Sequence, residues 1–332
     1  MKSPKPVPPR KSPTPFLDAL GIAMVVFSVG LLGTLVAYAA GYSEAAFRLN
    51  VLTQRLRSFP TAARQKNVRC SYGQAWSLSP NLERIRGNAD VRKMLHVERR
   101  DGGFVLVQTP LGPYWIPARE LDVLAETIAD EQRNVYEGSM AGVQKGDVVL
   151  DCGANIGTYT RHALERGAKL VVAIELAPES LECLRRNLEK EIASGRVVVY
   201  PKGVWNKDDV LQLSISDEWA STAASVVLDR GGQGPKVPLT TIDKLVAELR
   251  LTKVDFVKMD IEGSEMQALE GAVETVRRFH PRMAIAVEHR PSDPDRIPEL
   301  VHRLWPEYQY ECGPCTNVNG SIQPDVLFAR VR

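Results

Sequence analysis

The sequence predicts an α/β protein with a doubly wound, mainly parallel β-sheet. From residue 147 onward, short apolar runs alternate with helix-forming segments, which is the order expected of parallel strands joined by helices. The chain then closes with two strand-like runs, at 308–312 and 325–331, that have no helix between them. This second observation favours an antiparallel pair at the edge of the sheet.

The N-terminal segment predicts a membrane anchor. Residues 1–18 form a basic, proline-rich tail, and residues 19–41 carry no charged side chain. At about 1.5 Å per residue, a helix over 19–41 spans the roughly 30 Å hydrocarbon layer of a bilayer, so a single-pass transmembrane helix is expected. Basic residues flank both ends of this segment and do not fix its orientation. The alternative is a signal peptide cleaved after Ala39, which would release an exported domain.

Residues 42–102 are expected to be a stalk and helical linker. A helix is predicted over 43–59, with Pro60 as its stop. The main domain is assigned to 103–332 and begins with a β-hairpin at 103–118, where two β-rich runs flank the turn TPLGP. We expect this hairpin to cover the edge or the mouth of the main domain.

Five apolar runs are expected to form the parallel strands, with helix-forming segments between most of them. They are DVVLDCG at 147–153, KLVVAIEL at 169–176, RVVVYPKG at 196–203, VDFVKMDIEG at 254–263 and MAIAVEHR at 283–290. Ligands of open α/β sheets bind outside the carboxyl ends of the strands. The residues that end these runs are therefore the first candidates for a site.

Charge and cysteine usage argue against two classes of function. The chain has 42 Lys and Arg against 40 Asp and Glu, with no dense basic cluster in the main domain, so nucleic acid is not an expected partner. Cys152 and Cys183 fall in core segments, which predicts free thiols in a reducing compartment. Cys312 and Cys315 have the spacing of a thioredoxin-like pair, but no helix is expected after them, so we expect a loop without redox function.

The turn after the first parallel strand is expected to bind a ligand. In VVLDCGANIGTYT the strand ends at Asp151, and Gly153 and Gly157 follow it four residues apart. Glycines let a backbone approach a ligand closely, and the next helix directs its N-terminal amides there. The spacing differs from the G-x-G-x-x-G of dinucleotide sites, and no G-x-x-x-x-G-K-[ST] loop occurs. A ligand without phosphates is favoured.

Glu175 identifies the class of ligand. It ends the second strand, where a carboxylate can accept hydrogen bonds from both hydroxyls of a ribose. S-adenosylmethionine has a ribose and no phosphate, and its cationic groups suit an acid such as Asp151. We therefore predict S-adenosylmethionine as the cofactor.

Three blocks resemble the signature of FkbM-type methyltransferases, in which a K-x-D-x-E-G-x-E block follows the glycine turn. They are DVVLDCGANIGTYT at 147–160, PLTTIDKL at 238–245 and VDFVKMDIEGSEMQALEGA at 254–272. The resemblance covers roughly 103–331. It implies the seven-stranded sheet of class I methyltransferases and methyl transfer to a hydroxyl oxygen, often of a sugar or a polyketide.

The resemblance also assigns residues to roles. It implies that the cofactor is bound by Asp151, Gly153, Asn155, Gly157 and Glu175. The residues that match the second part of the signature are Lys258, Asp260, Glu262 and Glu265.

Methyl transfer from a sulfonium is a direct displacement, so the protein must align the acceptor oxygen and take or share its proton. The candidates near the ends of the fourth and fifth strands are Asp260, Glu262, Glu288 and His289. His289 is a natural base because its reference pKa is nearest neutrality. Asp260 is our choice for a direct role, and Glu262, two residues on, is expected on the same face of an extended strand. No residue is assigned to a metal, and a metal at the acceptor site stays open.

The sequence thus predicts a membrane-anchored S-adenosylmethionine-dependent methyltransferase that modifies a hydroxyl of a sugar, glycolipid or related metabolite. Its partners would be the lipid bilayer, through 19–41, and a small-molecule or glycan acceptor. The catalytic domain is expected in the cytoplasm, where the cofactor is made. The alternatives are a catalytically silent, membrane-tethered binding protein with the same fold, and the exported domain described above.

Overall fold

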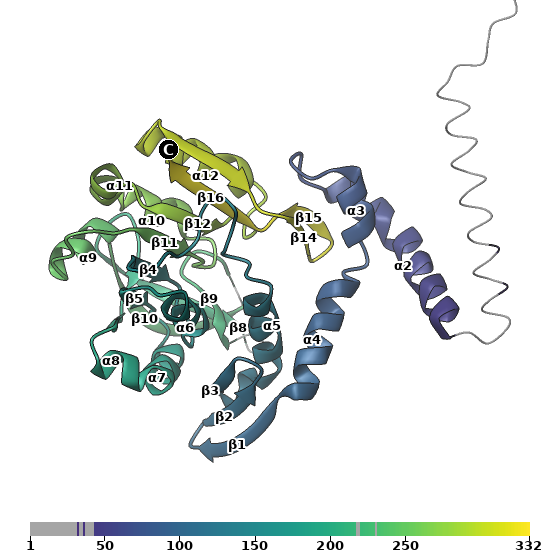
Figure 1. The fold of residues 1–332 in the computed structure, drawn as a ribbon, viewed down its shortest axis with the longest axis horizontal. Helices are drawn as coiled ribbons and strands as arrows, with labels where there is room; N and C mark the ends of the chain where they lie inside the picture. Colours follow the sequence, from purple (N-terminus) through teal and green to yellow (C-terminus); the bar gives the residue numbers. More distant parts are fainter. Residues whose placement is uncertain (1–31, 33–35, 37–42, 217–219, 230) are drawn as a thin grey trace, which may run out of the picture. The chain divides into compact units, whose positions relative to one another are not determined.

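The computed structural model describes Leu32, Val36 and residues 43–216, 220–229 and 231–332 (Figure 1). The chain divides into two compact units, Met1–Pro60 and Thr61–Arg332. Among the described residues, no helix is long and apolar enough to cross a membrane. The predicted tail and the predicted span at 19–41 lie outside the described residues, apart from Leu32 and Val36.

Helix α2 (Ser43–Gln65) begins in the first unit and ends in the second. The prediction that it stops at Pro60 is wrong, because Pro60 lies inside the helix. Proline removes one backbone donor. Pro60 is exposed, so water can satisfy the carbonyl group that this donor would have bound.

The centre of the second unit is a seven-stranded sheet with the order β13-β16-β12-β11-β4-β5-β6. The five adjacent strands from β12 to β6 pair in parallel. Strand β16 is antiparallel to its two neighbours, β12 and β13. The doubly wound sheet and its antiparallel edge pair are therefore confirmed. The strands are β4 (Val148–Cys152), β5 (Leu170–Ile174), β6 (Val197–Tyr200), β11 (Phe256–Met259), β12 (Arg282–Ala286), β13 (Tyr308–Cys312) and β16 (Val326–Val331).

Helices cover both faces of this sheet, which is why all five residues of β4 are buried. Leu150 and Cys152 pack on the face covered by α9 to α12, and Val149 packs on the opposite face with Tyr159 and Ala163 of α6. The helices are α6 (Thr158–Glu165), α7 (Pro178–Asn187), α8 (Glu189–Ala193), α9 (Ile242–Glu248), α10 (Glu265–Glu270), α11 (Val273–Phe279) and α12 (Asp293–Leu304).

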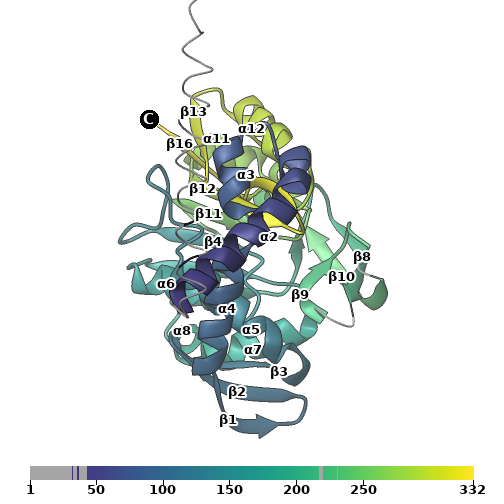
Figure 2. The ribbon, with the colours of Figure 1, turned by 90° about the vertical axis from the view of Figure 1, so that its right-hand side faces the viewer.

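A four-stranded sheet with the order β7-β10-β8-β9 lies between β6 and α9 in the chain and was not predicted. Figure 2 shows β8, β9 and β10 beside the main sheet. Leu211, Leu213 and Ile215 alternate with polar residues in β8, which is a strand pattern. The strands are β7 (Gly203–Val204), β8 (Asp209–Ser216), β9 (Ala220–Ser225) and β10 (Gly232–Thr240).

The predicted hairpin is confirmed as two antiparallel strands, and a third strand, β1, pairs with its outer edge. Val107 and Tyr114 of the hairpin share a core with Ile128 of α5, Ile156 of the glycine turn and Cys183 of α7. The small sheet is thus packed against the loop that was predicted to bind the cofactor. The elements are α3 (Tyr72–Leu78), α4 (Leu82–Met94), β1 (His96–Asp101), β2 (Phe104–Thr109), β3 (Gly112–Pro117), η1 (Ala118–Glu120) and α5 (Leu121–Gln132).

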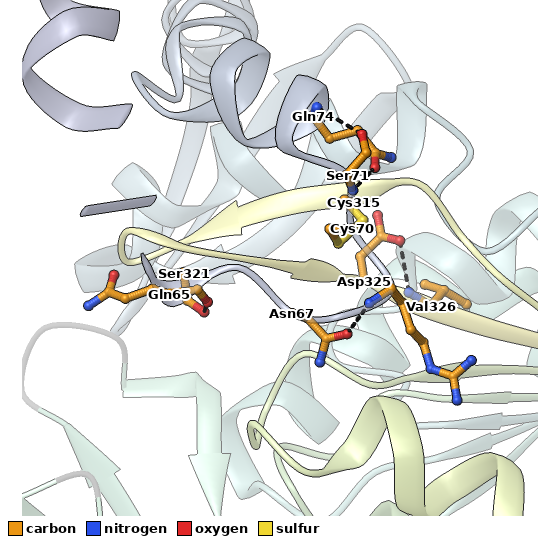
Figure 3. The surroundings of a disulfide bond; sticks show 10 residues. Gln65, Asn67, Cys70, Ser71, Gln74, Cys315, Ser321, Asp325 and Val326 are labelled. Carbon is orange, nitrogen blue, oxygen red and sulfur yellow. Dashed lines mark hydrogen bonds between the residues drawn. A yellow bond between two sulfur atoms is a disulfide. The ribbon is translucent and has the colours of Figure 1, made fainter. Parts of the chain in front are cut away.

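A disulfide between Cys70 and Cys315 joins the segment before α3 to a C-terminal hairpin, β14 (Cys315–Val318) and β15 (Ser321–Pro324) (Figure 3). The sequence predicted a reducing compartment and no disulfide. The bond was not predicted because Cys70 and Cys315 are 245 residues apart in the sequence. Cys152 and Cys183 are buried free thiols, as predicted. Cys312 is also free, so the C-x-x-C spacing does not form a disulfide of its own.

Candidate active site

A cavity of about 800 Å³ opens at the carboxyl ends of β4, β5, β11 and β12. The glycine turn and the strand ends form its floor, and α4, α5 and the β14–β15 hairpin contribute its outer wall. The residues predicted from the sequence that line it are Gly153, Asn155, Glu175, Asp260, Glu262 and His289. Asp151 and Gly157 do not line it.

Packing explains both glycines of the turn. At Gly153 φ is +81°, and a Cβ atom would lie 1.8 Å from the carbonyl oxygen of Asp260. At Gly157 φ is +91°, and a Cβ atom would lie 2.8 Å from Leu184 and Leu188. Only glycine fits at either position. The turn is therefore fixed by the close approach of other parts of the protein, and Gly157 is the N-cap residue of helix α6.

Glu175 is buried at the edge of the cavity and shapes the turn. One carboxylate oxygen accepts a hydrogen bond of 2.8 Å from the amide of Asn155, and the other accepts bonds of 2.7 Å from the amides of Leu176 and Ala177. Burial raises the pKa of Glu175, although these amides oppose the shift. A carboxylate has about four acceptor positions, and these three bonds leave about one, so Glu175 can still accept one hydroxyl of a ribose rather than the predicted two.

Asp151 is fully buried beneath the turn and does not reach the cavity, so we withdraw its predicted direct contact with a cationic cofactor. It accepts a hydrogen bond of 2.6 Å from the Thr160 hydroxyl, and Lys258 Nζ lies 3.4 Å from its other oxygen. Lys258 also donates to the Gly153 carbonyl at 2.9 Å. Burial lowers the pKa of Lys258, but Asp151 and Asp260 raise it by more. The pair holds the turn in place from below.

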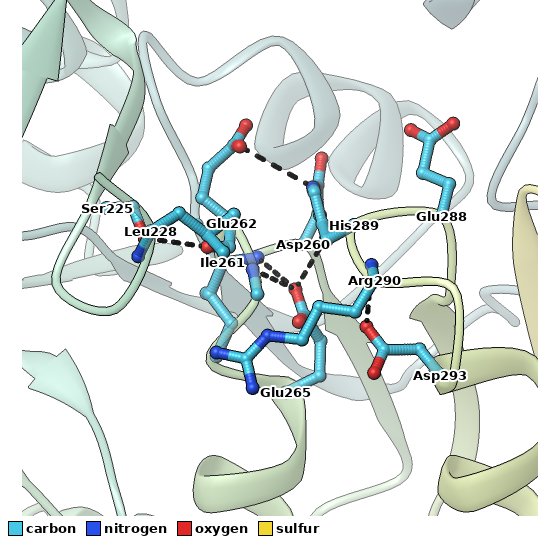
Figure 4. Close-up of polar contacts among 12 residues, drawn as sticks. Ser225, Leu228, Asp260, Ile261, Glu262, Glu265, Glu288, His289, Arg290 and Asp293 are labelled. Carbon is cyan, nitrogen blue, oxygen red and sulfur yellow. Dashed lines mark hydrogen bonds and ion pairs between the residues drawn. The ribbon is translucent and has the colours of Figure 1, made fainter. Parts of the chain in front are cut away.

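Asp260, Glu262 and His289 converge at the ends of β11 and β12 (Figure 4). His289 Nε2 lies 3.5 Å from Asp260 Oδ1 and 3.6 Å from Glu262 Oε2. The reason predicted for this proximity is wrong, because β11 ends at Met259 and Glu262 has a φ of +55°. A turn, not the alternation of a strand, brings the two carboxylates together.

The surroundings of His289 change its predicted role. Its Nδ1 lies 3.1 Å from Glu265 Oε1, and Glu265 is almost fully buried. Burial lowers the pKa of His289, but Glu265, Glu262 and Asp260 raise it well above its usual value. These carboxylates stabilise the protonated imidazole, so His289 is a weaker candidate for the base than its reference pKa suggested. The prediction that His289 is the base relied on the reference pKa of histidine and is therefore corrected.

Two further acids at the cavity titrate near neutrality. Burial raises the pKa of Glu288 to about 7, and burial raises the pKa of Glu131 to about 7 as well. Burial also raises the pKa of Asp260, but Lys258 and His289 lower it by more, so Asp260 is ionised. Glu288, which was among the sequence candidates, therefore fits the requirements of a general base better than His289 does.

Sequence reasoning missed Tyr136. Its hydroxyl donates a hydrogen bond of 2.8 Å to Asp260 Oδ2, from a segment 124 residues earlier in the chain. Burial is the main cause that raises the pKa of Tyr136, so it remains a donor. A lone tyrosine in a polar connecting segment carries no local signal for such a contact.

Residues 151–313 match the family model described as the methyltransferase FkbM domain. The chain contains an FkbM methyltransferase domain. The resemblance seen in the three sequence blocks is confirmed, and the main sheet has the seven strands that this resemblance implied.

The sequence relatives of the FkbM domain include three curated proteins. The hexuronic acid methyltransferase AglP of Haloferax volcanii is 29% identical over 51% of this chain and 67% of its own length. Methyltransferase 1 of Beauveria bassiana is 26% identical over 37% of this chain and 57% of its own. The AMB antimetabolite synthetase AmbE of Pseudomonas aeruginosa is 25% identical over 60% of this chain, which spans only 11% of that protein.

Among solved structures, the chain is similar to the methyltransferase FkbM of Methylobacillus flagellatus. The identity is 18%, the TM-score is 0.44, and the match covers 75% of this chain and 59% of the other. A precorrin-6y C5,15-methyltransferase of Geobacter metallireducens matches with 15% identity and a TM-score of 0.36, over 60% of this chain and 87% of the other.

Proposed function

We propose that this methyltransferase uses S-adenosylmethionine to methylate a hydroxyl oxygen of a sugar, glycolipid or related small molecule. The observation that carries the proposal is the shared cavity, in which the glycine turn and Glu175 face the same space as Asp260 and Glu288. Ligand cavities are typically about 300–1,000 Å³. The volume of about 800 Å³ accommodates a nucleoside cofactor with a small acceptor beside it.

The chemistry of the walls suits a polar acceptor. S-adenosylmethionine, when bound, supplies a methyl group on a positively charged sulfur. Asn88, Asn317 and Asn319 line the outer part of the cavity, where amides can hydrogen-bond to hydroxyl groups. Asp260 would orient the acceptor hydroxyl, and Glu288 would take its proton. AglP, the relative named for a hexuronic acid, supports a sugar as the acceptor.

Binding and turnover test the two halves of the proposal separately. Calorimetry should detect S-adenosylmethionine binding, and Glu175→Ala should weaken it by more than about tenfold, since hydrogen bonds to a charged group contribute about 1.5–3 kcal/mol. Unchanged affinity would remove the ribose assignment. Mass spectrometry of glycan and lipid fractions, with and without the protein, should reveal the acceptor as a species heavier by one methyl group.

A catalytically silent binding protein is the competing function. It would bind the cofactor but release no S-adenosylhomocysteine with any fraction that contains the acceptor. Glu288 supports turnover, because it lines the cavity with Asp260 and has a pKa of about 7, which suits a general base.

We also propose that residues 19–41 anchor the chain in a membrane and that the catalytic domain faces the cytoplasm. The support is the uncharged sequence of this segment and the cytoplasmic supply of the cofactor.

A further inference from the structure

We propose that Asp260, Glu262 and His289 bind a divalent transition-metal ion, with one coordination position open to the acceptor hydroxyl. The role given to the ion rests on the proposed methyl transfer, whereas binding of the ion does not. Each of the three residues offers one ligand atom, and the three atoms lie within 4.8 Å of one another.

The spacing of these atoms fits a shared ion better than it fits hydrogen bonds. His289 Nε2 is 3.5 Å and 3.6 Å from the two carboxylate oxygens, beyond the usual range of about 2.7–3.2 Å for N–H···O bonds. Ligand atoms at about 2.0–2.2 Å from one ion, in tetrahedral geometry, lie about 3.4 Å apart. The imidazole and the two carboxylates can therefore converge on an ion with small rotations of their side chains.

Glu265 is the independent observation that favours ligation. Its buried carboxylate lies 3.1 Å from His289 Nδ1 and also accepts the amide of Ile261 at 2.9 Å. Histidines that ligate metals usually direct their other ring nitrogen to a carboxylate, which fixes the ring and increases its basicity. Here that arrangement leaves Nε2 as the nitrogen that points to Asp260 and Glu262 (Figure 4).

The donor atoms of the cluster also suit a divalent ion. Carboxylate oxygens of Asp260, Glu262 and Glu265 lie within 3.6 Å of the ring nitrogens of His289, and Lys258 Nζ lies 3.9 Å from Asp260 Oδ2. One imidazole and two carboxylates suit Zn²⁺, a borderline ion, and also Mn²⁺, a harder ion that prefers carboxylate ligands. Three protein ligands with an open position are typical of catalytic metal sites. An ion there would lower the pKa of the acceptor hydroxyl that Glu288 deprotonates.

The test uses the full-length protein, freed of metal with a chelator and titrated with MnCl₂ or ZnCl₂ by calorimetry. We expect one site, and we expect His289→Gln and Asp260→Asn each to weaken binding at least about tenfold. Glu265→Gln should also weaken it about tenfold or more, as outer partners of metal ligands do. Glu131→Gln is the matched control, because it removes another carboxylate that lines the same cavity and is not among the proposed ligands; the metal affinity should stay within about threefold.

Two readouts keep the test decisive. Electron paramagnetic resonance of the Mn²⁺-loaded parent protein should detect coupling to an imidazole nitrogen, which needs no variant to fold. If the parent protein binds S-adenosylmethionine but neither ion, the metal site is overturned and the proposed function stands. Metal binding that is the same in the parent and in His289→Gln would also overturn the site. Metal binding with no affinity for S-adenosylmethionine would instead contradict the proposed function.

Discussion

Asp260 accepts a hydrogen bond from the Tyr136 hydroxyl, and Lys258 Nζ lies 3.9 Å from the same carboxylate. These two contacts fix the direction of the ionised carboxylate before any acceptor binds. We expect Asp260→Asn to reduce methyl transfer at least about 100-fold, because positioned acid–base groups contribute about 10²–10⁴-fold. S-adenosylmethionine affinity should change less than about threefold, since Glu175 and the turn are untouched. Calorimetry and release of S-adenosylhomocysteine measure the two quantities.

Tyr136→Phe separates orientation of Asp260 from its charge. The change removes one hydrogen bond to a charged group and keeps the ring, so we expect a loss of about 10–100-fold in kcat/KM. The double variant with Asp260→Asn should lose little more than Asp260→Asn alone, because the hydroxyl acts through that carboxylate. Additive losses in this double-mutant cycle would mean that Tyr136 acts on its own.

Glu288 should make stability depend on pH. Burial raises its pKa from 4.5 to about 7, so the folded protein keeps a proton that the unfolded chain loses near pH 4.5. Its contribution to stability is therefore present below about pH 4.5 and is lost as pH rises to about 7. We expect Glu288→Gln to exceed the parent by about 2–3 kcal/mol in unfolding free energy at pH 8, and by much less at pH 5. Urea unfolding at both pH values measures this, and an equal difference at both would contradict the shift.

At the scale of elements, the β14–β15 hairpin connects the disulfide to the cavity. Cys315 begins β14, and Asn317 of the same strand donates to the carbonyls of Leu78 and Ser79 while also lining the cavity. Gln323 of β15 donates to the carbonyl of Glu288. The disulfide therefore restrains a wall of the site, although neither cysteine lines it.

We expect Cys70→Ser to lower the unfolding free energy of the oxidised protein by about 2–5 kcal/mol, since the bond closes a long loop. Amide exchange should quicken first in β14 and β15. Cys312→Ser is the control, because Cys312 is a free thiol at the end of β13 and should change stability and methyl transfer little. A loss in Cys312→Ser as large as that in Cys70→Ser would contradict this difference between the two cysteines.

The elements that could be predicted are those whose burial leaves a local pattern. β4 and β5 are covered on both faces, so their residues read as apolar runs that end at the site. β10 could not be recognised, because it contains Gly232, Gly234, Pro235 and Pro238, residues that usually mark turns. The convergence of Asp260 and His289 followed from the common edge of parallel strands. The contact from Tyr136 and the raised pKa of His289 depend on tertiary neighbours that no short stretch of sequence records.

At the scale of the whole molecule, two features point to opposite sides of a membrane. A disulfide is typical of oxidising compartments, whereas S-adenosylmethionine is a cytoplasmic cofactor. We expect the catalytic domain to lie on the cytoplasmic side, because a methyltransferase without its methyl donor has no reaction to perform. In the cytoplasm, glutathione and thioredoxin would keep Cys70 and Cys315 reduced, so the bond would form only on oxidation.

Intact cells test this orientation directly. A membrane-impermeant maleimide should leave the protein unlabelled, and a permeant maleimide should label Cys70 and Cys315, which mass spectrometry of tryptic peptides would detect. Cys312 serves as the internal control, because it is free in both the oxidised and the reduced protein and reports access alone. Labelling of Cys312 by the impermeant reagent, with Cys70 and Cys315 protected by their disulfide, would place the domain outside the cytoplasm. The cofactor would then have no supply on that side, and the exported domain would become the better description.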